Sequence, residues 1–248
     1  MVKTYFSINY EFDKKEVHRA IKAAQKGYIC VADGVVMNTA NRDPEYLKVV
    51  NGSLFSICDS SWVPVYLKSI YGIKYDQYCG AEIFKDIISS RKYRMIFMGT
   101  SQATLDGLQN ELKKMNPDVE AMQFIELPFR KVEDFDYPEI AKMIEDDGAK
   151  IIWVALGAPK QERFMNLLLP HLNQGVMLGV GAAFKFYSGT AESRCPVWMQ
   201  KCHLEFVYRI MQDPKKQLKR CFWILWTLPG LYFGEVNRAR KAKKARKG

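Results

Sequence analysis

Residues 151–162 read IIWVALGAPKQE, an apolar run rich in β-branched residues followed by Gly, Pro and charged residues. The apolar run predicts a buried strand, Ile151–Leu156, and the residues after Pro159 predict the first turn of a helix. Such a segment brings a helix N-terminus to the end of a strand. Because the free N–H groups and the dipole of that terminus suit an anion, we expect a phosphate or diphosphate to bind here.

Strand-like and helix-like segments alternate on both sides of this segment. Apolar runs predict further strands at Thr4–Ile8, Tyr28–Val31, Leu54–Cys58, Arg94–Met98 and Val119–Ile125. Helical spacing and capping residues predict helices at Lys14–Lys26, at Gln102–Met115 and from Asp43-Pro44 onward. This alternation predicts an α/β, Rossmann-like fold in which helices flank a largely parallel sheet.

Three predicted strands end in residues that suit a binding site. Asp33-Gly34 follows Val31, Asp59 follows Cys58, and Gly157-Ala158-Pro159 follows Leu156. Open parallel sheets bind ligands outside the carboxyl ends of their strands, so we expect these loops to form one site. Gly181, in the segment GVGAAF, fits either a wall of this site or tight packing.

Asp59 has two interpretations from the residues alone. A carboxylate at a strand end can act as a general base, and it can equally cap the predicted helix Ser61–Ser69. Without further information the capping role is the simpler of the two, and both roles are compatible.

The basic charge of the chain lies in its C-terminal tail. The formal net charge is +10, and eleven Lys and Arg follow Asp213 against a single acid, Glu235. Helices are predicted at Leu204–Gln212 and from Pro214 onward. We therefore divide the chain into an α/β core, residues 1–203, and a helical, basic and aromatic appendage, residues 204–248.

The appendage has the composition of a segment that lies on a membrane surface. Its apolar part, Cys221–Phe233, is too short to span a bilayer, but Trp223, Trp226 and Tyr232 suit the interface. The basic residues around it would attract an anionic leaflet. Nucleic-acid binding and packing against the core are alternatives. Because the apolar residues are contiguous rather than interleaved with Lys and Arg, we favour lipid and expect no nucleic-acid partner.

The cysteines and histidines do not suggest a cofactor. The six cysteines include no Cys-x-x-Cys pair, which favours reduced core thiols in a cytosolic protein. His18, His171 and His203 are far apart in the sequence, so we expect no metal and no cofactor. The N-terminus has no apolar core of the signal-peptide type. The sequence leaves open whether the chain forms a homo-oligomer.

Several motifs together resemble the WecB/TagA/CpsF family of bacterial glycosyltransferases. They are LGAPKQE, GVGAAF followed by SG, P-x-W-M-Q, and LE-F-x-YR, and the resemblance runs from about Tyr28 to about Arg220. It implies an inverting, metal-independent transfer from a UDP-sugar to a polyprenyl-diphosphate-linked saccharide, with Asp59 as general base. The enzyme would work at the inner face of the cell membrane, in the synthesis of a surface polysaccharide. A non-catalytic sugar-nucleotide-binding partner, docked on the membrane in the same pathway, is the alternative.

The resemblance also implies two sets of binding residues. The donor would be bound by Asp33, Gln77, Gly157, Ala158, Pro159, Lys160, Gln161, Gly181 and Lys185. The diphosphate of donor or acceptor would be bound by Arg209, Lys216, Lys219 and Arg220.

Three donor positions depart from the family pattern. Asp33 replaces an Asn, Gln77 an Arg and Lys185 an Asp. We expect an Asp33–Lys185 pair in the pocket and a donor sugar that differs from N-acetylmannosamine.

Overall fold

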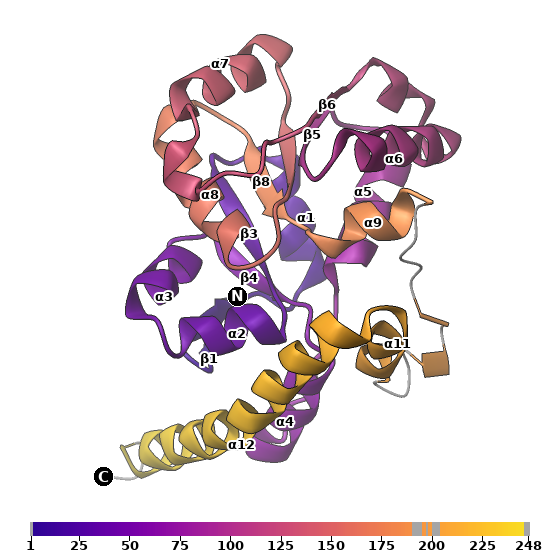
Figure 1. Cartoon of the computed structure of the whole chain (residues 1–248). Helices are drawn as coiled ribbons and strands as arrows, with labels where there is room; N and C mark the ends of the chain where they lie inside the picture. The colour runs from indigo at the N-terminus through magenta and orange to yellow at the C-terminus, as the bar shows by residue number, and fades with distance from the viewer. Residues whose placement is uncertain (1, 190–194, 197, 200–203, 246–248) are drawn as a thin grey trace.

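The structure is a computed structural model that describes residues 2–189, 195–196, 198–199 and 204–245, and every statement below refers to these (Figure 1). It contains one eight-stranded sheet in the order β1-β2-β4-β3-β8-β7-β5-β6. All neighbouring strands are parallel except β1 and β2. The predicted α/β fold with a largely parallel sheet is therefore confirmed. The strands are β1 (Lys3–Tyr5), β2 (Ile8–Tyr10), β3 (Gly27–Ala32), β4 (Phe55–Cys58), β5 (Met95–Gly99), β6 (Gln123–Ile125), β7 (Ile151–Ala155) and β8 (Val176–Gly179).

Two of the predicted strands are not continuous strands in the structure. Residues 4–8 make a hairpin rather than one strand, because Phe6 and Ser7 adopt positive φ angles of 49° and 66° and reverse the chain. Residues 119–125 divide between a 3₁₀ turn, Pro117–Ala121, and the short edge strand β6. Local apolar composition did not reveal either break.

The central strands are buried on both faces, and alternate residues enter two separate cores. Tyr28, Cys30 and Ala32 of β3 pack into one core, whereas Ile29 and Val31 pack into the other. Helices cover both faces of the sheet (Figure 1). Residues of α2, α3, α4, α7 and α8 belong to the first core, and residues of α1, α5, α6 and α9 to the second.

The helices begin close to the positions that the sequence predicts. Asp43 accepts hydrogen bonds from the N–H groups of Glu45 and Tyr46 and so caps α3 as expected. The helix Gln102–Met115 has the predicted bounds. The helices of the core are α1 (Lys14–Lys22), α2 (Gly34–Ala40), α3 (Pro44–Asn51), α4 (Trp62–Tyr71), α5 (Gly80–Ser90), α6 (Gln102–Met115), α7 (Tyr137–Asp147), α8 (Lys160–Leu168) and α9 (Ala182–Tyr187).

The C-terminal region forms two helices, α11 (Glu205–Gln212) and α12 (Pro214–Ala245). α12 is continuous through Pro229 and packs against α2 and α4 (Figure 1). Within the described residues, no helix is both long enough and apolar enough to cross a membrane.

A buried carboxylate fastens α12 to the N-terminal hairpin and to α4. Glu235 is 2% exposed and accepts hydrogen bonds from the Phe6 backbone N–H at 3.0 Å and the Tyr71 hydroxyl at 2.7 Å. Arg238, one turn further along α12, forms an ion pair with the same carboxylate at 2.6 Å. Nearer its start, α12 places Ile224 against Gly34, the first residue of α2.

Candidate active site

The carboxyl ends of four parallel strands surround a cavity of about 350 Å³. Loops that follow β3, β4, β7 and β8 all reach its wall. Six of the residues that the sequence singles out line this cavity: Asp33, Asp59, Gly157, Ala158, Gln161 and Gly181. The location agrees with the rule for open parallel sheets.

Asp59 directly follows β4, and hydrogen bonds of its side chain and its backbone hold it at the cavity wall. Its Oδ1 accepts from the backbone N–H of Gly80 at 2.8 Å, and Gly80 is the first residue of α5. The Gln77 side-chain amide donates to the backbone carbonyl of Asp59 at 2.7 Å. A carboxylate held in a fixed position beside a cavity can accept a proton from a bound hydroxyl group.

Asp59 does not cap the helix that follows it. The N-cap residue of α4 is Ser61, and the Asp59 carboxylate bonds to the N-terminus of α5 instead. The simpler interpretation of Asp59, as a cap for the next helix, is therefore wrong. It failed because the contact joins residues about twenty positions apart.

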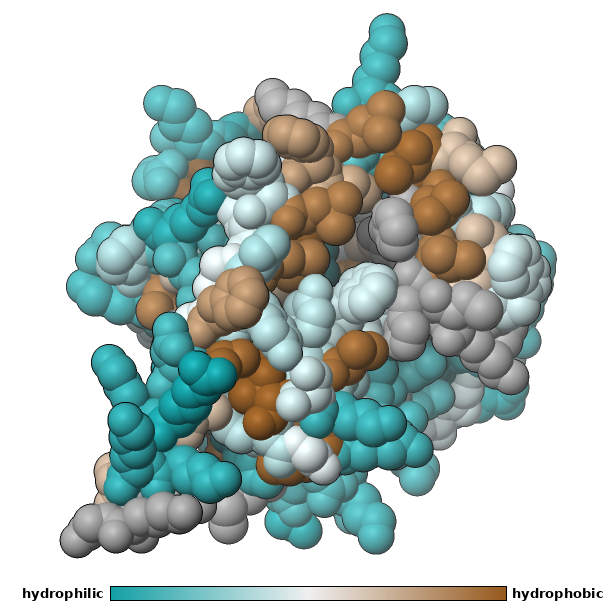
Figure 2. Space-filling view, turned by 90° about the horizontal axis from the view of Figure 1, so that it is seen from below, coloured by the Kyte–Doolittle hydropathy of each residue, from teal (hydrophilic) through white to brown (hydrophobic). Residues whose placement is uncertain are grey.

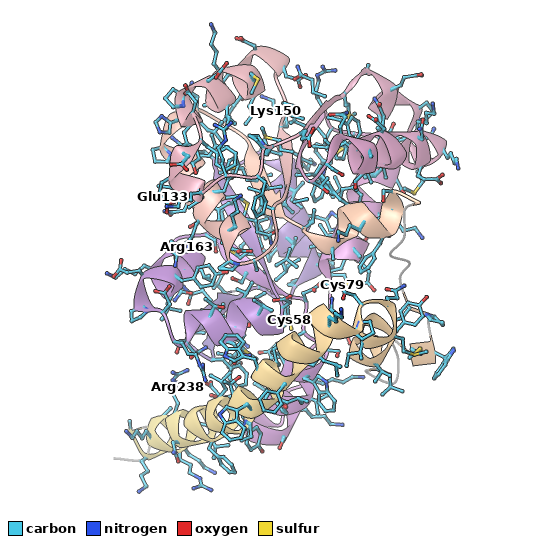
Figure 3. All side chains as sticks on the ribbon, viewed as in Figure 1. Cys58, Cys79, Glu133, Lys150, Arg163 and Arg238 are labelled. Carbon is cyan, nitrogen blue, oxygen red and sulfur yellow. The ribbon has the colours of Figure 1, made fainter. Side chains whose placement is uncertain are left out.

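Two cysteines lie next to this carboxylate. Cys58 ends β4, Cys79 is the N-cap residue of α5, and the two lie near each other in Figure 3. Burial raises the pKa of the Cys58 thiol well above its usual value, and the neighbouring charge of Asp59 adds to this effect. Cys58 is therefore a protonated, buried thiol at neutral pH.

Asp33 uses its carboxylate to cap α2. Its Oδ1 accepts hydrogen bonds from the N–H groups of Val35 and Val36 at 2.8 and 3.0 Å. Asp33 thus has a structural role at the cavity wall, in addition to any contact with a ligand.

Gln161 is the most enclosed polar side chain of the site, at 4% exposure. Its Nε2 donates to the Glu162 carboxylate at 2.8 Å and to the Gly179 carbonyl at 3.2 Å. Glu162 is fully buried and also accepts from the Tyr46 hydroxyl at 2.9 Å. Burial raises the pKa of Glu162 to about 7, although these two hydrogen bonds and one from its own backbone N–H act in the opposite direction.

Four of the expected donor-binding residues do not line the cavity. Gln77 instead supports the Asp59 backbone, and Pro159 directly precedes α8. Lys160 places its ammonium 5.3 Å from the centre of the Phe129 ring. Lys185 lies in α9, which begins at the cavity wall with Ala182.

The four basic residues expected to bind a diphosphate lie in α11 and α12. The side chains of Arg209, Lys216, Lys219 and Arg220 lie outside the part of the chain that the structure describes.

Sequence reasoning missed two parts of the site. Cys79, Gly80 and Ala81 line the cavity, but they follow no strand and so escaped the search of strand ends. The Tyr46–Glu162 pair supports Gln161 from α3, across 116 positions of sequence. Only the Glu next to Gln161 in the motif could have hinted at this pair. Among the described residues, no group of three or more His, Cys, Asp or Glu side chains could hold a metal ion.

An open sheet with a polar cavity at the carboxyl ends of its strands defines an α/β protein with a ligand site at the sheet edge. Residues 7–244 match the Glycosyl transferase WecG/TagA/CpsF family, so the chain belongs to this family and is a glycosyltransferase.

Curated relatives are similar over most of the chain. One is the N-acetylglucosaminyldiphosphoundecaprenol N-acetyl-beta-D-mannosaminyltransferase of Bacillus subtilis (strain 168), 24% identical over 201 residues. The alignment covers 77% of this chain and 76% of that enzyme. The enzyme of the same name from Staphylococcus aureus (strain MW2) is 24% identical over 231 residues, with 88% and 83% of the two chains covered.

Proposed function

We propose that this glycosyltransferase moves a sugar from a UDP-linked donor to a polyprenyl-diphosphate-linked saccharide, with inversion at the anomeric carbon. The observation that carries the proposal is that Asp59 and Gln161 line the same cavity. The names of the relatives, which specify an N-acetylglucosaminyl diphosphoundecaprenol substrate, support a lipid-linked acceptor.

Asp59 is the general base of the proposed reaction. A hydroxyl oxygen of the acceptor forms a bond to the anomeric carbon of the donor sugar, on the face opposite the nucleotide. The bond from that carbon to the diphosphate oxygen breaks, and UDP leaves with the electron pair. The proton of the acceptor hydroxyl passes to the Asp59 carboxylate, which the Gly80 N–H holds in position.

Helix N-termini at the cavity wall suit the diphosphate that departs. α9 begins at Ala182, which lines the cavity, and Ala158 lies two residues before α8. Their positive ends would stabilise the charge that develops on the leaving group. Basic side chains of α11 and α12, with Arg209 and Arg220 among them, are proposed to add to this effect.

The donor sugar is proposed to differ from N-acetylmannosamine. Asp33 lines the cavity with its carboxylate bonded to the start of α2, where the family pattern has an Asn. Lys185 lies in α9, where the family pattern has an Asp. A carboxylate instead of an amide at position 33 would favour different contacts with the sugar hydroxyls and so change the choice of donor.

The test is a transfer assay that compares the wild type with Asp59→Asn. A panel of UDP-sugars, including UDP-N-acetylmannosamine, is incubated with a short-chain polyprenyl-diphosphate-linked N-acetylglucosamine. We expect one donor to give product, and the substitution to lower kcat by at least about 100-fold, the usual size of a general-base contribution. UDP affinity should stay within about threefold, because the amide keeps the shape of the carboxylate.

Two results would contradict this assignment. Equal turnover by wild type and Asp59→Asn would remove Asp59 from the reaction. Tight UDP-sugar binding without turnover of any donor would favour the alternative of a non-catalytic binding partner.

We also propose that α12 docks the enzyme on the inner, cytoplasmic face of the membrane. Its outward face carries a stripe of apolar residues at helical spacing: Leu218, Phe222, Leu225, Trp226 and Phe233 are all more than half exposed. α4 adds Trp62 and Val65, which are 41% and 39% exposed. Figure 2 shows hydrophobic side chains on this side of the molecule and hydrophilic ones beside the C-terminal end of α12.

The three aromatic residues expected at the membrane differ in their surroundings. Trp226 is 74% exposed and lies on the outward stripe. Trp223 is half-buried beneath the guanidinium of Arg42, 5.0 Å from its ring. Tyr232 is half-buried and shares a hydrogen bond of 2.9 Å with Ser69. We therefore propose Trp226 as the main interfacial anchor of the three.

A further inference from the structure

The carbonyl oxygen of Gln161 has no hydrogen-bond partner among the described residues, although it is buried. Buried polar atoms are nearly always paired, and an unpaired acceptor costs stability. Gln161 lines the cavity, so a bound ligand could supply the donor that this oxygen lacks.

The orientation of the amide follows from its other partners. Gln161 Nε2 faces the Gly179 carbonyl and the Glu162 carboxylate, and these oxygens can only accept while Glu162 is ionised. Exchange of the amide nitrogen and oxygen would place an oxygen against two other oxygens. The carbonyl oxygen is therefore held on the side of Gly181, another cavity residue, where a Cβ atom would lie 3.2 Å from it.

The carboxylate that holds the amide is itself held from a second helix. Glu162 accepts the Tyr46 hydroxyl of α3 at 2.9 Å, and both side chains are fully buried. Arg163, which is labelled in Figure 3, joins α8 to the N-cap residue of α3 through an ion pair with Asp43 at 2.7 Å. The titratable groups that interact electrostatically with Glu162 are Asp33, Cys30, Tyr28 and Tyr46.

We propose that Glu162 and Tyr46 are positioning residues that present the Gln161 carbonyl oxygen to the cavity as an obligate hydrogen-bond acceptor. The ligand group bound there must then carry an O–H or N–H. This inference rests on the proposed function for the identity of that ligand, in which the sugar part of the donor supplies the group. Its hydroxyl and acylamino groups are donors of this kind.

Two substitutions of Glu162 separate positioning from a structural role. Glu162→Gln keeps an oxygen that can accept from Gln161, and its own amide can donate to the Tyr46 oxygen. Glu162→Met has a similar length but offers no acceptor, so the Gln161 amide loses the shorter of the two hydrogen bonds that set its orientation and keeps the one to the Gly179 carbonyl. Met removes a buried charge but leaves the buried Tyr46 hydroxyl without its acceptor, so the melting temperature of each variant is measured beside its affinities.

The experiment measures binding and amide order on the full chain. Calorimetry gives the affinities for UDP and for the UDP-sugar that supports turnover in the wild type. We expect Glu162→Met to bind that UDP-sugar about tenfold more weakly, the worth of one hydrogen bond, with UDP affinity unchanged. Glu162→Gln should stay within about threefold of the wild type.

NMR of the Gln161 side-chain amide, assigned with Gln161→Met, requires no donor. Its N–H signals should exchange slowly and titrate with Glu162 in the wild type, and exchange fast in Glu162→Met. Wild-type amide protection or wild-type UDP-sugar affinity in Glu162→Met would overturn the proposal. An equal loss of affinity for UDP and for the UDP-sugar would also overturn it. So would a loss of affinity in both variants that accompanies a lower melting temperature. A wild type that binds no sugar nucleotide but shows the expected amide signals would refute the proposed function and leave the positioning role supported.

Discussion

Glu162 shows how one buried residue can serve a site at a cost in stability. Its carboxylate is fully buried, and its hydrogen-bond donors, Gln161, Tyr46 and its own backbone N–H, are all neutral groups. No cation among the described residues forms an ion pair with it, so desolvation dominates and raises its pKa to about 7. In our proposal this carboxylate positions the Gln161 amide, a role that an apolar residue could not fill.

The raised pKa predicts how stability changes with pH. An acid with a higher pKa in the folded state binds more protons there than in the unfolded chain, whose Glu titrates near 4.5. Glu162 therefore contributes its full stabilisation below about pH 4.5 and loses it as pH rises through 7.

The measurement compares the unfolding free energies of wild type and Glu162→Gln, from urea denaturation at several pH values. Between pH 4.5 and pH 8 the wild type should lose on the order of 3 kcal/mol relative to the variant. A constant difference across this range would show that Glu162 titrates as it does in the unfolded chain.

At the scale of the element, the sequence was most informative where one strand leads into one helix. The segments that contribute Asp33, Asp59 and Gly157 were each recognised from a short apolar run and the residues after it, and their loops meet at one cavity. The N-terminal hairpin and β6 were not recognised. The points at which their predicted strands are interrupted depend on backbone angles and on position at the sheet edge, not on local hydrophobicity. The α5 N-terminus escaped because only tertiary packing brings Gly80 to Asp59.

α12 also differs from what its composition suggests when taken alone. Glu235 is the single acid among the basic residues of the tail, and it is one of the residues that join the helix to the core. In the net charge of the tail this residue changes the total by only one unit, whereas in the structure it bonds to Phe6 and Tyr71.

We expect Glu235→Leu to lower the free energy of unfolding by about 2–4 kcal/mol. The substitution leaves the Phe6 N–H and the Tyr71 hydroxyl without their acceptor, and it leaves Arg238 without its ion pair. Asn237→Leu, at an exposed position two residues along the same helix, is the matched control. Urea denaturation followed by tryptophan fluorescence measures both. Similar midpoints for the two variants would mean that this contact does not hold α12 to the core.

For the whole molecule, the apolar stripe of α12 and the exposed residues of α4 form one docking surface in our proposal. A simple truncation after Asp213 would test it poorly. Removal of α12 would also expose the surfaces of α2 and α4 that it covers. Substitutions on the outward stripe avoid this problem.

We expect Phe222→Ser combined with Trp226→Ser to reduce binding to vesicles that contain phosphatidylglycerol by at least about tenfold. Both side chains are at least 70% exposed, so the substitutions should leave the melting temperature almost unchanged. Sedimentation with vesicles measures the binding. Wild-type binding should also weaken as salt is added, because the exposed residues Arg240, Lys241, Lys243 and Lys244 follow the stripe. Undiminished binding by the double variant would exclude this surface.

The attachment of α12 to the core at several points along its length determines how the enzyme would be oriented on a bilayer. Ile224 rests on the first residue of α2, immediately after Asp33, and Glu235 is anchored eleven residues further along. Because these contacts lie far apart along α12, the helix cannot rotate relative to the α/β core. If α12 lies flat on the membrane surface, the opening of the cavity stays at a constant height and angle above the lipid headgroups. Selection among lipid-linked acceptors would then depend on how far each sugar chain extends from its anchor, as well as on its chemistry.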